Sequence, residues 1–110
     1  MNSNASRRIQ EPVFVAENQE LVDLFLAQNP SIESEVVQAA NAISLRLADT
    51  EFFLHVSVDP DSGETCLLLR VLRSKYVREE KKIFDSVMSD FVSSFEKFLI
   101  TPIFSRPSYA

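Results

Sequence analysis

The chain of 110 residues contains one glycine, one cysteine and no tryptophan. A single glycine excludes the glycine-rich phosphate loops of P-loop and dinucleotide-binding enzymes, because those loops need glycine at several positions. A single cysteine excludes an internal disulfide and is most simply a small apolar residue in a reducing compartment. No stretch approaches the roughly 20 apolar residues of a membrane-spanning helix.

Arg7 and Arg8 are not followed by the apolar segment of a signal peptide, so we expect a cytoplasmic protein that is not bound to a membrane. The hydrophobic share of 45% is typical of a folded domain. We expect a disordered tail over residues 1–10, one α+β domain over residues 11–100 and a C-terminal tail over residues 101–110.

Two apolar segments around the only glycine predict a β-hairpin over residues 51–73. Apolar residues alternate along both segments, at Phe52, Leu54, Val56 and Val58, and then at Leu67, Leu69 and Val71. Between them, Asp59-Pro60-Asp61-Ser62-Gly63-Glu64 has the residues of a tight turn. Pairing Asp59 with Glu64 places all of the alternating apolar residues on one face of the hairpin.

Helices are predicted on both sides of the hairpin. Residues 17–28 form a short helix that Pro30 ends, and a second helix covers residues 31–48. Residues 77–100 form a long amphipathic helix, whose apolar stripe is Phe84, Val87, Met88, Phe91, Val92, Phe95, Phe98 and Leu99. The whole predicts an α+β fold in which this last helix packs on the sheet, and residues 11–16 are a candidate third strand.

Two sets of residues have the composition of a chemical site. His55 and Cys66 are predicted diagonal neighbours on the outer face of the hairpin, but no orienting group or oxyanion site accompanies them. The acidic turn at Asp59 has its glycine at the fifth position and Arg70 at the twelfth, whereas an EF-hand needs glycine sixth and glutamate twelfth. We therefore expect no enzyme, no metal and no cofactor, with a hydrolase that uses Cys66 as a remote alternative.

Charge is unevenly distributed along the chain. Residues 70–82 contain six basic and two acidic residues, a net charge of +4, which leaves −9 for the rest of a chain whose total is −5. An acidic protein with one basic segment is not an obvious nucleic-acid binder, and the segment itself suits contact with an acidic partner.

The run Val56-Ser57-Val58-Asp59-Pro60-Asp61-Ser62-Gly63-Glu64-Thr65-Cys66-Leu67-Leu68-Leu69-Arg70-Val71, followed by an amphipathic helix, resembles a pattern in short uncharacterised bacterial proteins. Those proteins have a helix, a hairpin and a closing helix, and some are encoded beside toxin-like partners. The resemblance covers residues 30–95 and implies an antitoxin-like or accessory role. It defines no functional residues, and this chain lacks the tryptophan near the end of the last helix.

The function expected from the sequence is a non-enzymatic protein-interaction module that self-associates, as a homodimer, and that has a possible further protein partner. Exposed hairpin edges and surplus apolar surface favour it. The expected interaction residues are Phe53, Leu68, Arg70, Arg73, Lys75, Arg78, Phe104 and Tyr109. The alternative is a nucleic-acid-associated regulator that uses the basic segment 70–82, with Arg73, Lys75, Arg78 and Lys82 as contacts.

Overall fold

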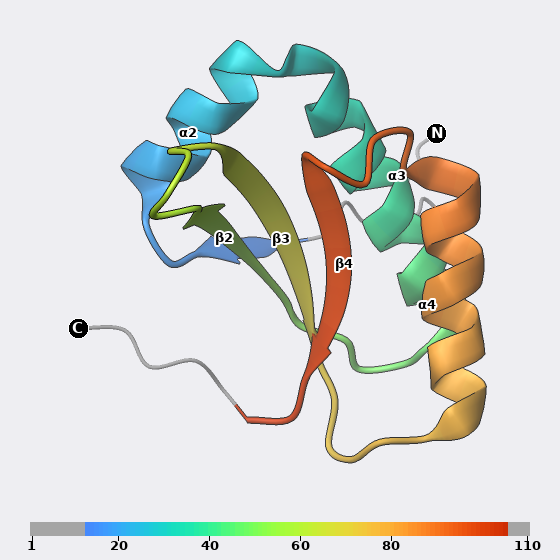
Figure 1. Cartoon of the computed structure of the whole chain (residues 1–110). Helices are drawn as coiled ribbons and strands as arrows, with labels where there is room; N and C mark the ends of the chain where they lie inside the picture. The colour runs from blue at the N-terminus through green and yellow to red at the C-terminus, as the bar shows by residue number, and fades with distance from the viewer. Residues whose placement is uncertain (1–12, 106–110) are drawn as a thin grey trace, which may run out of the picture.

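Three helices and four strands make up the fold in a computed structural model, which describes residues 13–105 (Figure 1). The predicted tail over residues 1–10 lies outside the described residues, as does Tyr109. In chain order the elements are β1 (Phe14–Ala16), α2 (Gln19–Gln28), α3 (Pro30–Arg46), β2 (Phe52–Val58), β3 (Thr65–Leu72), α4 (Arg78–Phe91) and β4 (Phe98–Ile103).

The four strands form one mixed sheet in the order β1-β2-β3-β4. The central pair, β2 and β3, is antiparallel, and each outer strand runs parallel to its inner neighbour. Two crossover connections therefore flank the hairpin: α2 and α3 join β1 to β2, and α4 joins β3 to β4. Parallel neighbours require such a connection, because a tight turn can join only antiparallel strands.

The predicted hairpin and its register are confirmed. Leu54 pairs with Leu69, Val56 with Leu67 and Val58 with Thr65. The turn is closed by the Asp59 amide, which donates to the Glu64 carbonyl at 2.9 Å. Gly63 has a φ of +77°, a conformation that other residues adopt only at a cost, so the only glycine of the chain stands where the turn requires it.

The two N-terminal helices are also confirmed, with bounds close to those predicted. The side chain of Asn18 accepts a hydrogen bond from the Leu21 amide and caps α2. Pro30 stands in the first turn of α3, where its missing N–H would have had no partner inside the helix. Of residues 11–16, the candidate third strand, residues 14–16 form the edge strand β1, and residues 11 and 12 lie outside the described residues.

The predicted long C-terminal helix is wrong: α4 ends at Phe91, and the chain reverses to form a fourth strand. Ser93 explains where the helix stops. Its amide and its hydroxyl both donate to the carboxylate of Glu35 on α3, at 2.9 and 2.6 Å, so the amide is not available to continue α4. Ser93 and Ser94 also have weak helix propensity.

The last strand, β4, lies parallel to β3 with Phe98 opposite Leu67 and Ile100 opposite Leu69. Residues 101–103, which the sequence placed in a C-terminal tail, belong to this strand. The carbonyls of Lys97 and Ile103 accept hydrogen bonds from the amides of Leu67 and Arg73. Backbone polar groups of successive strand residues point to alternate sides, so the backbone of Pro102 faces away from β3. Proline suits that position because an edge strand needs no N–H on its outer side.

The core lies between the helices and one face of the sheet. Strand residues that alternate along β2, β3 and β4 pack there against α2, α3 and α4. The core cluster includes Val22, Phe25, Val36, Ile43, Phe52, Leu54, Leu67, Leu69, Val71, Phe84, Val87, Phe98 and Ile100. Within the described residues, no helix has the length and apolar character needed to cross a membrane.

A pair of phenylalanine substitutions tests the reversal after α4. In a continuous helix Phe95 and Phe98 would share the apolar stripe, whereas in this fold Phe98 is 0% exposed and Phe95 is 55% exposed. We expect Phe98→Ala to lower the free energy of unfolding by about 3–5 kcal/mol, and Phe95→Ala by less than about 1 kcal/mol. Urea denaturation measures both, and equal losses would contradict the strand assignment.

Candidate interaction site

A partly enclosed, mainly apolar pocket of about 180 Å³ lies beside the first half of α4. The segment between β3 and α4 forms one end, α4 forms one wall and the last residues of β4 form the other. The apolar part of its lining is Tyr76, Val77, Phe84, Ile100, Pro102 and Phe104. We call this the α4 pocket.

An ion pair fixes the segment between β3 and α4 at the closed end of the pocket. The guanidinium of Arg73 donates through Nε and Nη2 to the two carboxylate oxygens of Glu80, at 2.9 and 2.6 Å. Both side chains are largely buried. This two-point contact is the strongest geometry available to an arginine and a carboxylate, and it fixes the start of α4 relative to β3.

The first turn of α4 positions the wall of the pocket. Val77 precedes the helix, and its carbonyl accepts from the amides of Glu80 and Lys81. Glu79 and Glu80 stand in this turn, where carboxylates interact favourably with the positive end of the helix dipole. Residues spaced by three and four along α4 share one side of the helix, which brings Val77, Lys81 and Phe84 to the pocket.

The mouth of the pocket is flanked by exposed aromatic side chains and by a second ion pair. Tyr76 and Phe104 are both exposed. The ammonium of Lys81 donates to Oδ2 of Asp85 at 2.8 Å, and this hydrogen bond raises the pKa of Lys81 above its usual value. The site therefore combines a small apolar cavity with a polar, charged rim.

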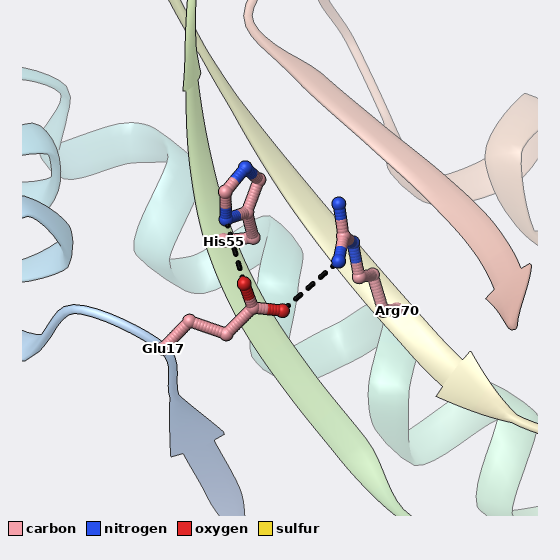
Figure 2. Close-up of polar contacts among 3 residues, drawn as sticks. All are labelled: Glu17, His55 and Arg70. Carbon is pink, nitrogen blue, oxygen red and sulfur yellow. Dashed lines mark hydrogen bonds and ion pairs between the residues drawn. The ribbon is translucent and has the colours of Figure 1, made fainter. Parts of the chain in front are cut away.

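The opposite face of the sheet has a polar cluster at its centre (Figure 2). Glu17, directly after β1, places Oε1 2.9 Å from Nδ1 of His55 on β2 and Oε2 3.0 Å from Nη1 of Arg70 on β3. The Glu17 amide also donates to the Leu54 carbonyl. One carboxylate thus joins three strands, which gives the short edge strand β1 an attachment beyond its own ladder.

The geometry around Cys66 does not resemble that of a nucleophile. Cys66 is paired with Ser57 in the register, its closest recorded polar contact is the Leu67 carbonyl at 3.8 Å, and the imidazole of His55 faces Glu17. Burial raises the pKa of the Cys66 thiol, an effect that the nearby Lys97 only partly offsets. An activated cysteine needs the opposite shift.

The acidic turn shows the contacts of a turn. Oδ1 of Asp59 accepts from the Asp61 amide at 2.8 Å and from the Ser62 amide at 3.4 Å. Among residues 13–105, no group of three or more His, Cys, Asp or Glu side chains is arranged to hold a metal ion.

The interaction residues expected from the sequence are dispersed by the fold. Arg73 and Phe104 meet at the α4 pocket, whereas Lys75 and Arg78 are only chain neighbours of the lining residues Tyr76 and Val77. Arg70 lies with Glu17 on the opposite face, and Leu68 is half-buried there. Phe53 is only 1% exposed, so its expected role as surplus apolar surface is wrong.

Sequence reasoning missed the rest of the pocket. Tyr76 and Val77 lie between the cations Lys75 and Arg78 of the basic segment. Two apolar residues in such a segment could have indicated an apolar contact surface there. Ile100 and Pro102 could not be recognised as pocket residues, because the sequence analysis placed them in a helix and in a C-terminal tail and not in the strand that carries them. Comparison of the chain with protein-family models, with curated proteins and with solved structures found no match.

A carboxylate substitution tests the attachment of β1. We expect Glu17→Gln to lower the free energy of unfolding by about 1–2 kcal/mol, because His55 and Arg70 both lose a half-buried partner. Asp85→Asn, which breaks only the exposed pair with Lys81, should lower the free energy of unfolding far less, because solvent screens that pair. Urea denaturation of both variants measures the difference, and equal effects would contradict a special role for Glu17.

The reactivity of Cys66 tests the direction of its pKa shift. Alkylation by iodoacetamide at neutral pH should be slower in the folded protein than after unfolding in urea, because less thiolate is present. The native thiol holds its proton more tightly than the unfolded one, so its contribution to stability is complete below the ordinary thiol pKa and declines as pH rises past it. Faster alkylation of the folded protein would contradict this assignment.

Proposed function

We propose that this protein is a non-enzymatic interaction module whose α4 pocket receives one apolar side chain of a partner polypeptide. The observation that carries the proposal is the size of the pocket together with its lining. An apolar cavity of about 150 Å³ is enough to hold one benzene molecule. A pocket of about 180 Å³ therefore accommodates one aromatic or branched aliphatic side chain.

The size favours a polypeptide over a free small molecule. Sites for small molecules usually enclose about 300–1,000 Å³, because they must bury most of the ligand. Protein interfaces instead use pockets for single anchor side chains, with tyrosine, phenylalanine and arginine concentrated around them. Exposed Tyr76 and Phe104 at the mouth of the α4 pocket supply that surrounding contact surface.

Backbone pairing along the sheet is a weaker route to a partner. The hairpin strands are interior in the strand order, because β4 pairs with residues 67–72 of β3 and β1 pairs with residues 52–54 of β2, so much of the hairpin edge that was expected to be exposed is covered. Of the two edge strands, β1 has three residues and β4 has Pro102 at an outward position. Short strands and prolines are ways in which proteins protect sheet edges. The partner is thus recognised through side chains.

A second copy of the chain is the less favoured partner. The expectation of a homodimer depends on exposed hairpin edges and on apolar surface at Phe53, Leu68, Phe104 and Tyr109. Much of the hairpin edge is covered by β1 and β4, Phe53 is buried, Leu68 is half-buried, and Tyr109 lies outside the described residues. Phe104 remains as exposed apolar surface. An antitoxin-like or accessory role, which the resemblance of the hairpin segment implies, would be one use of a module that binds a different chain.

Selection of peptides from a random dodecapeptide library displayed on phage tests the proposal. We expect the selected peptides to share one apolar anchor and to bind the wild-type protein. Phe104→Asp should weaken their binding about tenfold or more, because burying one apolar side chain contributes about 1.5–3 kcal/mol and a carboxylate at the pocket opposes it. Fluorescence anisotropy measures the affinities.

Phe95→Asp is the matched control, because Phe95 is exposed to a similar degree and does not line the α4 pocket. Peptides that bind both variants equally well, or a library that yields no binding peptide, would refute the proposal. Sedimentation of the same proteins identifies a second copy as the occupant if a dimer forms and Phe104→Asp dissociates it.

A further inference from the structure

Three of the six cations of the basic segment are already paired with carboxylates. Arg70 contacts Glu17, Arg73 contacts Glu80 and Lys81 contacts Asp85. The exceptions are Lys75, Arg78 and Lys82, which are exposed and which form no ion pair with any residue from 13 to 105. The fold has therefore neutralised half of this segment and left three cations unpaired.

These three cations are not part of the lining of the α4 pocket, but each is the chain neighbour of a lining residue. Lys75 immediately precedes Tyr76, which lines the pocket, while Arg78 and Lys82 each follow a lining residue, Val77 and Lys81. Lys82 follows Arg78 by four positions on α4, so both stand on one side of the helix, about one turn apart. We call Lys75, Arg78 and Lys82 the basic rim.

The basic rim contrasts with the rest of the molecule. The chain carries a net charge of −5 even with these three cations included. An acidic ligand is therefore repelled by most of the protein and attracted at this one border. Such a distribution orients an approaching partner and excludes partners of the wrong charge.

We propose that the segment bound by the α4 pocket carries aspartate or glutamate residues beside its apolar anchor. This inference rests on the proposed function of the pocket. The anchor side chain occupies the pocket, and the neighbouring carboxylates of the partner pair with Arg78, Lys82 and Lys75. An acidic polypeptide suits the site better than a nucleic acid, because the apolar lining offers a place for an anchor side chain next to the cations, whereas contacts to phosphates need the cations alone.

The test uses the peptides selected from the dodecapeptide library whose binding depends on Phe104. We expect an excess of aspartate and glutamate next to the shared apolar anchor. Replacement of these residues by glutamine and asparagine should weaken binding to the wild-type protein about tenfold at low salt, and raising the salt concentration should reduce the difference. Fluorescence anisotropy of labelled peptides measures both effects.

The double variant Arg78→Glu/Lys82→Glu should weaken the acidic peptides about tenfold or more and leave their uncharged versions unchanged. Arg46→Glu/Lys97→Glu is the matched control, because it alters the net charge equally through exposed cations outside the pocket lining. It should change neither affinity by more than about twofold.

Each result separates this inference from the proposed function. The inference would be overturned if the pocket-dependent peptides carry neutral or basic residues beside the apolar anchor, or if acidic peptides bind both double variants alike. Either result would still leave the pocket as an interaction site. A library without any pocket-dependent peptide would overturn both. Binding of a thymidylate dodecamer is measured with the same variants. If Arg78→Glu/Lys82→Glu abolishes this binding and Phe104→Asp does not, the basic rim binds nucleic acid, and the proposal of an acidic polypeptide partner is overturned.

Discussion

The contact between Glu35 and Ser93 is the constraint on which the C-terminal half of this fold depends. By accepting both the amide and the hydroxyl hydrogen of Ser93, the Glu35 carboxylate ends α4 and ties the following loop to α3. The chain then turns through residues 94–97 and returns beside β3. Without that return there is no fourth strand, and the α4 pocket loses the wall that Ile100 and Pro102 provide.

The parts of the fold that local chemistry determines were predictable from the sequence. The hairpin register follows from one glycine, one acidic turn and apolar residues at every second position, and a slip by one residue would expose all of them. The boundary between α2 and α3 follows from Pro30. In both cases residues close in sequence carry the whole signal, so no knowledge of distant contacts was needed.

The end of α4 was not predictable in the same way. Phe98 fits a helical stripe with Phe91 and Phe95, and it also fits a strand in which Ile100 is the next inward residue. Periodicity alone cannot separate the two patterns over so few residues. The deciding contact is made by Glu35, which lies 58 residues before Ser93 in the sequence, so no local pattern indicates it.

The candidate site was predicted only in part for a related reason. The basic segment is visible in the sequence. Which of its cations are neutralised depends on Glu17 and Glu80, which reach Arg70 and Arg73 only once β1, β3 and α4 have come together. Arg70 and Arg73 are three residues apart and serve opposite faces of the molecule, one in the sheet cluster and the other at the pocket. Counting charges along the chain therefore overestimates the positive surface.

The proline in β4 has a consequence for the behaviour of the protein at high concentration. Growth of a β-fibre requires each new strand to find a regular ladder of donors and acceptors along the exposed border of the previous one. At Pro102 that ladder lacks a donor, and at the other border β1 offers only three residues. Crowded copies of the folded domain thus have a poor template for polymerisation at either end of the sheet.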